Sequence, residues 1–226
     1  MGIALVFPAL PTVTLPVTGR AERFPVRRIF CVGRNYAEHS KEMGGDPEKE
    51  APFFFTKPAD AVVESGSRIP YPPATQNLHH EGELVVAIGK GGAMVSEEGA
   101  EAMIWGHAAG NDLTRRDLQA EAKERRRPWD MAKGFDKSAV VGAIRQGPLP
   151  EARLRCSVNG AVRQEASTKE MIWTPASIIA ALSQMVSLSP GDLIFTGTPA
   201  GVGPLNRGDT CKVEIEGLQS ASVTIA

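Results

Sequence analysis

Several protein classes are excluded by what this sequence lacks. Its 226 residues include three cysteines, Cys31, Cys156 and Cys211, an odd number with no CxxC pair, so neither a disulfide framework nor a zinc ribbon is expected. The apolar N-terminus has no basic region and is interrupted by prolines, which argues against a signal peptide. The sequence has no run of the roughly 18 apolar residues that a membrane-spanning helix needs. We therefore expect a soluble protein of the reducing cytoplasm.

An excess of charge of one sign is also missing. The 25 Lys and Arg residues are balanced by 26 Asp and Glu residues, which gives a formal net charge of -1. No overall basic field is then available to hold a nucleic acid or an anionic membrane. A small molecule is the better expectation for a partner.

Glycine and proline, by contrast, are abundant. The 23 Gly and 17 Pro residues indicate many turns and a β-rich architecture. The prolines of residues 1–26 favour an N-terminal extended arm over a packed helix. Because nothing in residues 27–226 has the composition of a flexible linker, we expect one domain there, with an α+β fold of many short strands and a few helices.

Local patterns indicate where the elements lie. Helices are predicted after Ser96, over residues 115–127 before Pro128, and over residues 175–188, which begin with proline. Asn159-Gly160 stands between two alternating runs and predicts a two-residue β-hairpin. Strands are predicted for RRIFCVG, FFFTKP, ELVVAIG, IWGHAAGNDLT, GDLIFTGTP, DTCKVEIEG and ASVTIA.

Two glutamates stand directly before an apolar strand in NLHHEGELVVAIG. Side chains alternate between the faces of a strand, so Glu81 and Glu83 point the same way, and their repulsion raises a pKa or recruits a cation. Oxygen-rich sites of this kind suit Mg²⁺ or Mn²⁺. Exposed charges at a strand end are an equally good interpretation of these two residues alone. His79 shares their face and His80 the opposite one, and neither is assigned as a ligand.

Two further motifs offer titratable side chains. Asp112 ends an apolar strand-like run, and it is either a third carboxylate of the same site or a helix N-cap. His39 and Glu42 are three residues apart in GRNYAEHSKEM, on one face of a helix, where a carboxylate can orient an imidazole that deprotonates water. Pairs with this spacing are mostly surface residues without a function.

The remaining candidates are a lysine and a turn. Lys133 lies in WDMAKGFD between aromatic residues, and a surface lysine is its ordinary interpretation. Residues 196–203, TGTPAGVG, can present backbone N–H groups or Thr hydroxyls to an oxyanion, or form only a tight turn. The turn lacks the GK[ST] of a phosphate-binding loop.

Together, five motifs in this order resemble the fumarylacetoacetate hydrolase family. They are GRNYAEH, HHEGEL, NDLTRRD, WDMAKGFD and TGTPAGVG, and the likeness is to the short single-domain acylpyruvases and fumarylpyruvate hydrolases. It extends from about Arg27 to the C-terminus. The resemblance implies a mixed β-sheet roll of the fumarylacetoacetase C-terminal-domain type, a catalytic domain over residues 27–226, and a homodimer.

The resemblance also implies roles for individual residues. His39 and Glu42 match a water-activating dyad on a segment that orders as a lid over bound ligand, and Lys133 matches the active-site lysine. The implied ligands of Mg²⁺ or Mn²⁺ are Glu81, Glu83 and Asp112. The implied residues near the substrate are Arg34, Arg116, Gln119 and Thr198.

The implied reaction is hydrolysis of the carbon–carbon bond of a 3-acylpyruvate. Fumarylpyruvate, an intermediate of gentisate breakdown in aromatic catabolism, is the preferred substrate because the likeness is strong through residues 27–63. Arg34 and Lys41 can pair with its distal carboxylate. Oxaloacetate decarboxylation, or a related isomerisation, is the alternative within the family. A metal-bound binding module without turnover is the alternative from another class.

Overall fold

An eight-stranded β-sheet forms the centre of the molecule. The computed structural model describes residues 4–42 and 51–226, and for residues 40–42 it describes only the backbone. β15 pairs in parallel with β3, and β11 with β5, whereas the other pairs in this sheet are antiparallel. Across the sheet the strands are β4 (Phe53–Lys57), β3 (Arg28–Gly33), β15 (Asp192–Phe195), β8 (Gly82–Ile88), β9 (Ile104–Asp112), β11 (Ala139–Val141) and β5 (Val62–Glu64), and β12 (Arg145–Gln146) pairs with β9.

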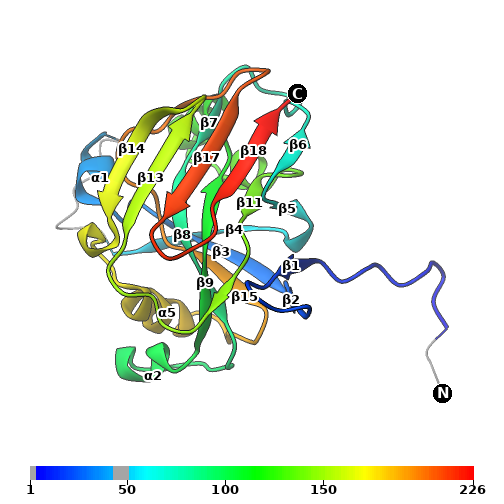
Figure 1. The fold of residues 1–226 in the computed structure, drawn as a ribbon, viewed down its shortest axis with the longest axis vertical. Helices are drawn as coiled ribbons and strands as arrows, with labels where there is room; N and C mark the ends of the chain where they lie inside the picture. The colour runs from blue at the N-terminus through cyan, green and yellow to red at the C-terminus, as the bar shows by residue number, and fades with distance from the viewer. Residues whose placement is uncertain (1–3, 43–50) are drawn as a thin grey trace.

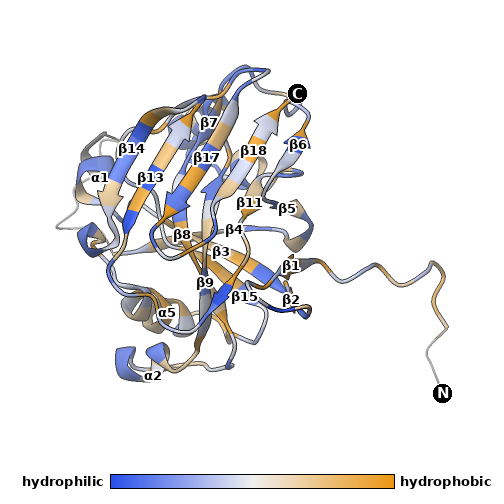
Figure 2. Ribbon diagram, viewed as in Figure 1, coloured by the Kyte–Doolittle hydropathy of each residue, from blue (hydrophilic) through white to orange (hydrophobic). Residues whose placement is uncertain are grey.

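A second, five-stranded sheet packs in front of the first (Figure 1). The side chains of β17 alternate between exposed and buried, as expected for a sheet with one face in water. Figure 2 shows this alternation as blue and paler bands along the front strands. The order of the strands is β14 (Ala161–Ser167), β13 (Arg153–Val158), β17 (Thr210–Ile215), β18 (Ala221–Ile225) and β6 (Ser67–Ile69). The expected β-rich α+β roll with mixed sheets is confirmed.

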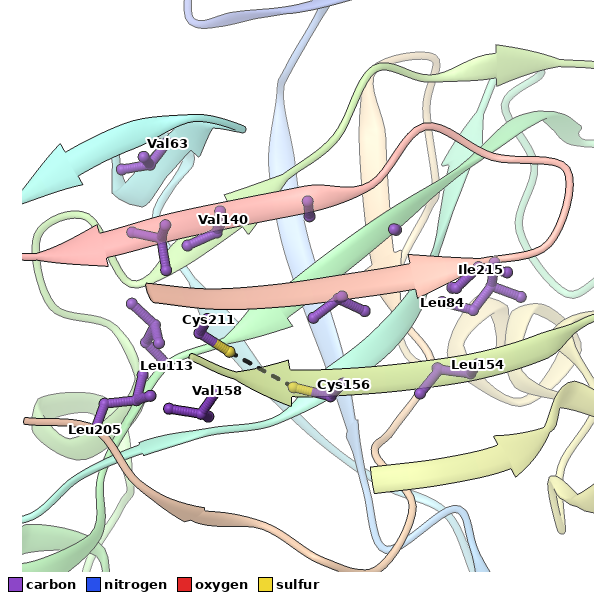
Figure 3. Packing of buried hydrophobic residues seen from close by; sticks show 14 of the residues in the cluster. Val63, Leu84, Leu113, Val140, Leu154, Cys156, Val158, Leu205, Cys211 and Ile215 are labelled. Atoms are coloured by element: carbon purple, nitrogen blue, oxygen red, sulfur yellow. Dashed lines mark hydrogen bonds between the residues drawn. The ribbon is translucent and has the colours of Figure 1, made fainter. Parts of the chain in front are cut away.

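The main core lies between these two sheets. Leu84 of β8 and Val140 of β11 lie in one apolar cluster with Leu154 of β13 and Ile215 of β17, and all four are buried (Figure 3). Burial of each such side chain stabilises the fold by about 1.5–3 kcal/mol.

The opposite face of the larger sheet is covered by two helices, α2 (Glu97–Glu101) and α5 (Pro175–Ser183). Ile178 and Ile179 of α5 are fully buried against the sheet. Thr174 caps α5 by accepting a hydrogen bond from the N–H of Ser177 at 3.1 Å. The helices predicted around Ser96 and from residue 175 are thus present. None of the helices in the described ranges is long and apolar enough to cross a membrane.

Two hairpins illustrate what local sequence could and could not indicate. Asn159 and Gly160 both have positive φ, 51° and 81°, which a type I′ turn requires, so the predicted hairpin of β13 and β14 is confirmed. A second hairpin, β1 (Thr14–Pro16) with β2 (Arg23–Pro25), forms inside the segment expected to be extended. Residues 4–10 before it extend away from the body (Figure 1).

The site is assembled from short elements at one end of the central strands. A small sheet joins β10 (Thr114–Arg115), β7 (Leu78–His80) and β16 (Gly203–Pro204). Three helices complete this region: α1 (Ala37–Glu42), α3 (Arg116–Glu124) and α4 (Asp130–Lys133). The helix predicted over residues 115–127 corresponds to α3, which ends before Pro128.

Candidate active site

Glu81, which joins β7 to β8, and Glu83, the second residue of β8, lie on one face of the chain. Gly82 between them faces the five-stranded sheet, where an added Cβ would lie 3.0 Å from the Cβ of Cys156. A larger residue there would push the segment away from that sheet. The tight packing on one side therefore directs both carboxylates to the other side, as strand alternation predicts.

Asp112, the last residue of β9, brings the third carboxylate to the same place. Its backbone N–H donates a hydrogen bond to the carbonyl of Glu81 at 2.9 Å. Carboxylate oxygens of Glu81, Glu83 and Asp112 all lie within 4.8 Å of one another, and the three residues are buried. The interpretations as exposed strand-end charges and as a helix N-cap are wrong, because Arg115 occupies the N-cap of α3.

Three buried or half-buried cations contact these carboxylates. Nζ of Lys133 donates to Oε2 of Glu81 at 2.7 Å and to Oδ2 of Asp112 at 2.8 Å. Nη2 of Arg116 donates to Oε1 of Glu81 at 2.6 Å. Nζ of Lys57 lies 2.7 Å from Oδ1 of Asp112, an ion-pair distance, although this oxygen accepts no hydrogen bond. Lys133 is 2% exposed, so its interpretation as a surface lysine is wrong.

The carboxylates differ in how well their charge is compensated. Burial opposes ionisation of Glu81, but the charges of Lys133 and Arg116 outweigh it and lower the pKa of this carboxyl. Burial, together with the charges of Asp112 and Glu81, raises the pKa of Glu83 well above its usual range. Among the described contacts, Glu83 accepts one hydrogen bond, from the N–H of Gly197 at 2.7 Å. The site thus holds an excess of negative potential at Glu83.

This donor set fits a hard divalent cation. All three side chains offer oxygen atoms, and the uncompensated carboxylate of Glu83 favours an added positive charge. The implied ligands Glu81, Glu83 and Asp112 are therefore brought together. Their assignment as ligands stays a prediction.

A pocket of about 380 Å³, part of it open to solvent, borders the carboxylates. His39 of α1 lines it and is itself 5% exposed. Arg34 follows β3 with a positive φ of 58°, a backbone conformation that costs a non-glycine residue roughly 1–2 kcal/mol. Its guanidinium lies 5.9 Å from the centre of the Phe53 ring. The side chain of Glu42 lies outside the described residues, as do residues 43–50 of the lid that is expected over residues 39–50.

The other candidates near the substrate border the same pocket. Nη1 of Arg116 donates to Oε1 of Gln119 at 2.5 Å, which links two of them. The hydroxyl of Thr198 donates to the carbonyl of Gly82 at 2.9 Å, and this fixes the turn of residues 196–203 beside the carboxylates. The turn is thus part of the pocket wall.

The two adjacent histidines lie on opposite faces. Nε of Arg116 donates to Nδ1 of His79 at 3.3 Å, which helps to hold this guanidinium against Glu81. Burial and the charge of Arg116 lower the pKa of His79 to about 4, so this ring is neutral. His80 faces the five-stranded sheet instead, where its Nδ1 lies 3.1 Å from Oε1 of Gln164. Neither histidine belongs to the carboxylate cluster.

Sequence reasoning missed several residues of the pocket. The sequence FFFTKP predicts a strand that includes Lys57. A lysine in such an apolar strand is expected to be buried, and a buried charge needs a partner of opposite charge. This pattern could have identified Lys57 as a residue of the site. Three aromatic residues and one further lysine of the pocket have no pattern in the sequence that marks them as pocket residues, because their positions depend on how α3 and α4 pack on β4. These residues are Phe53, Phe55, Lys123 and Trp129.

Comparison with known proteins agrees with this geometry. The family model described as fumarylacetoacetate (FAA) hydrolase C-terminal matches residues 28–226. The fumarylpyruvate hydrolase of Pseudomonas aeruginosa, crystallised with Mn²⁺ and pyruvate, superposes with a TM-score of 0.96 at 46% identity, over 99% of each chain. The fumarylpyruvate hydrolase of a Ralstonia species is 45% identical over 80% of this chain and 95% of its own length. The mitochondrial oxaloacetate tautomerase of Mus musculus is 43% identical over 86% of this chain and 89% of its own length.

Proposed function

The chain belongs to the fumarylacetoacetate hydrolase family, and we propose that it is a divalent-metal-dependent hydrolase that cleaves fumarylpyruvate to fumarate and pyruvate. The observation that carries this proposal is the cluster of Glu81, Glu83 and Asp112 beside a pocket that also contains His39. Relatives named fumarylpyruvate hydrolase, one of them with Mn²⁺ and pyruvate, support both the reaction and Mg²⁺ or Mn²⁺ as the cofactor.

The charges of the site favour an anionic substrate. Three carboxylates are matched by three cations, Lys57, Lys133 and Arg116. A bound divalent ion would then make the site net positive. A 2-oxo acid with a second carboxylate is the kind of ligand that such a field attracts.

Cleavage requires an activated water and a stabilised leaving group. When bound, the ion supplies Lewis-acid stabilisation of the negative charge that develops on the pyruvate half. His39 deprotonates the attacking water, with Glu42 as the residue proposed to orient its ring. The water oxygen bonds to the acyl carbon, the carbon–carbon bond breaks, and a proton is added to the pyruvate carbon.

Lys133 and its neighbours hold the charge that forms on the acyl oxygen. Burial disfavours the ammonium form of Lys133, but the charges of Asp112 and Glu81 outweigh this and raise its pKa, so the side chain stays positive. The amide of Gln119 and the hydroxyl of Thr198 also border the pocket and can donate there. Arg34, held over the Phe53 ring, is proposed to bind the distal carboxylate together with Lys41.

A direct assay tests the proposal. Loss of the enol absorbance of fumarylpyruvate is followed with the metal-loaded enzyme, after EDTA, and after Mn²⁺ or Mg²⁺ is added back. We expect activity that EDTA abolishes and either ion restores. Failure to turn over fumarylpyruvate, maleylpyruvate or acetylpyruvate with either ion would instead favour a binding module without turnover.

Action on oxaloacetate is the second candidate, because relatives at 41–43% identity are named oxaloacetate tautomerases. Tautomerisation or decarboxylation needs no activated water, whereas hydrolysis does. His39→Ala is therefore expected to lower fumarylpyruvate hydrolysis by about 10²–10⁴-fold and to spare any activity on oxaloacetate. Undiminished hydrolysis in His39→Ala would refute the assigned base.

We also propose a domain organisation, an oligomeric state and a cellular role for the enzyme. Residues 1–26 are proposed to precede a catalytic domain of residues 27–226, with residues 4–10 as an extended arm and the β1–β2 hairpin packed on the domain, and two chains are proposed to form a homodimer. The arm supports a dimer because its large apolar side chains are exposed in one chain: Leu5, Val6, Phe7 and Leu10. Gel filtration of a variant without residues 1–10 tests this, with a monomer as the expected result.

Fumarylpyruvate as substrate is consistent with a cytoplasmic role in aromatic catabolism.

A further inference from the structure

A second cluster of potential metal ligands lies on the other side of the strand that carries Glu81 and Glu83. His80, Cys156 and Cys211 are all buried, and their ligand atoms lie within 4.8 Å of one another. Figure 3 shows the sulfurs of Cys156 on β13 and Cys211 on β17 directed toward each other between the sheets. The chemistry proposed for the carboxylate site uses none of these three side chains.

The spacing of the donor atoms matches a tetrahedral ion. The two sulfurs are 3.5 Å apart, Sγ of Cys156 is 3.5 Å from Nδ1 of His80, and that nitrogen is 3.1 Å from Oε1 of Gln164. Around an ion with tetrahedral bonds of about 2.0–2.3 Å, neighbouring ligand atoms lie roughly 3.3–3.8 Å apart. These three spacings are within a few tenths of an ångström of this range, and the ligand atoms of His80 and Cys211 also lie within 4.8 Å of each other.

A disulfide fits these positions less well. Cys156 is opposite Val213 in the register of β13 and β17, and Cys211 is opposite Val158, so the cysteines are diagonal neighbours. Diagonal residues of an antiparallel pair are about 7–8 Å apart. Disulfides usually join Cα atoms that are about 4.4–6.8 Å apart.

We propose that His80, Cys156 and Cys211, with Oε1 of Gln164 as a fourth donor, form a site for a thiophilic d¹⁰ cation such as Zn²⁺ or Cu⁺. Thiolate and imidazole ligands select such ions over the hard ions suited to the three carboxylates. Nδ2 of Asn111 donates to the sulfur of Cys211 at 3.3 Å, the kind of contact that stabilises a ligand thiolate from outside the coordination shell. His80 also lines a surface cavity together with Arg163 and Gly203, so one member of the cluster borders solvent-accessible space.

An ion bound at the thiolate site of His80, Cys156 and Cys211 would affect the active site through Gln164. Its Oε1 accepts from the N–H of Gly82 at 2.9 Å, and its Nε2 donates to the hydroxyl of Thr198 at 2.7 Å. Coordination of Oε1 fixes the amide that holds both the segment between the two glutamates and the turn that carries Thr198. A soft ion at the thiolate site therefore rigidifies one wall of the substrate pocket.

Cd²⁺ titration tests the thiolate site. Reduced protein, kept in excess Mg²⁺ to occupy the carboxylates, is titrated with Cd²⁺ while the ultraviolet charge-transfer absorption of cadmium–thiolate bonds is recorded. We expect saturation at one equivalent per chain. Cys156→Ser and Cys211→Ser should each lower the Cd²⁺ affinity at least about tenfold, because each removes one of two thiolate ligands.

Cys31→Ser is the matched control. Cys31 is also fully buried, on β3, but it belongs to a different apolar cluster. The chain has only three cysteines, so charge transfer retained in Cys31→Ser must come from Cys156 and Cys211, even if their own serine variants do not fold. Absence of the absorption from the wild type, its loss in Cys31→Ser, or its full retention in Cys156→Ser or Cys211→Ser would overturn the proposal.

Discussion

The two sides of the segment from His80 to Glu83 have opposite chemistry. On one side Glu81 and Glu83 meet Asp112 among three cations, and every ligand atom is a carboxylate oxygen. On the other side His80 and Gly82 meet two thiols and an amide, with none of the carboxylates within the cluster. Strand alternation alone separates the two sets, because consecutive side chains point to opposite faces.

The neighbouring strand β9 repeats this division. Its residue Asn111 faces the thiols and donates to Cys211, whereas the next residue, Asp112, joins the carboxylates. The side chains that bridge the sides are amides: Asn111 accepts from the N–H of Glu81 at 3.0 Å, and Gln164 accepts from that of Gly82. One pair of strands can thus hold a charged hard site and a neutral soft site on adjacent residues.

The largest expected effect is on the carboxylate side. Glu83→Gln keeps the shape of the side chain but removes a ligand charge, so we expect kcat/KM to fall on the order of 10³-fold, which corresponds to several kcal/mol of lost stabilisation. Glu165→Gln, on the exposed face of β14, is the control and should retain activity. The thermal midpoint of metal-free Glu83→Gln should not fall, because the substitution removes carboxylate repulsion. A kcat/KM within tenfold of the wild-type value would show that Glu83 is not a ligand of the catalytic ion.

The next effect concerns charge compensation. Lys57→Met leaves the buried carboxylate of Asp112 without one of its cations, which should cost about 3 kcal/mol of unfolding free energy in the metal-free protein. Mn²⁺ should restore part of the loss. The control is Lys212→Met, which breaks an exposed ion pair with Glu214 and should cost less than about 1 kcal/mol. Urea denaturation measures both, and equal losses in the two variants would contradict the role of Lys57.

A smaller effect is expected at the bridge between the sides. Gln164→Leu leaves the buried N–H of Gly82 without its acceptor, which should lower the unfolding free energy by about 1–3 kcal/mol. Gln184→Leu, on the exposed end of α5, should change it by less than about 0.5 kcal/mol. If urea midpoints of Gln164→Leu and Gln184→Leu coincide, the amide is not a structural link.

The smallest effect lies outside both sites, at His107 of β9. Burial lowers the pKa of His107, whose Nδ1 lies 3.1 Å from the carbonyl of Gly147, so the folded state favours the neutral ring. As the pH falls below the ordinary histidine value of about 6.5, the unfolded chain takes up a proton that the folded chain resists, and stability is lost. Between pH 7 and pH 5, the unfolding free energy of His107→Gln should fall less steeply than that of the wild type. An identical slope would exclude His107 as a contributor.

Much of the architecture was predictable because it depends on local patterns. The turn at Asn159-Gly160 needs positive φ at both residues, and α5 has a proline start and apolar residues at helical spacing. The hairpin of β1 and β2 was not predictable in this way. It forms because Leu15 and Phe24 are buried against the central sheet, and this long-range contact has no local signature.

The residues of the two sites also divide into those that the sequence could predict and those that it could not. The common face of Glu81 and Glu83 follows from strand alternation, and the five motifs added Asp112 by resemblance. Lys57 and the thiolate site were missed, because the sequence separates Cys156 from Cys211 by 54 residues and only the pairing of β13 with β17 brings them together. Metal-ligand spacing in sequence detects local sites and not sites assembled across a sheet.

The most direct test of the carboxylate site is a crystal structure with Mn²⁺ and a pyruvate-like ligand, with the ion located by its anomalous scattering. We predict one Mn²⁺ with an oxygen of Glu81, Glu83 and Asp112 each about 2 Å away and the 2-oxo acid in the pocket beside His39. An ion bound elsewhere, with Glu81 and Asp112 still paired only with Lys57, Lys133 and Arg116, would contradict the account.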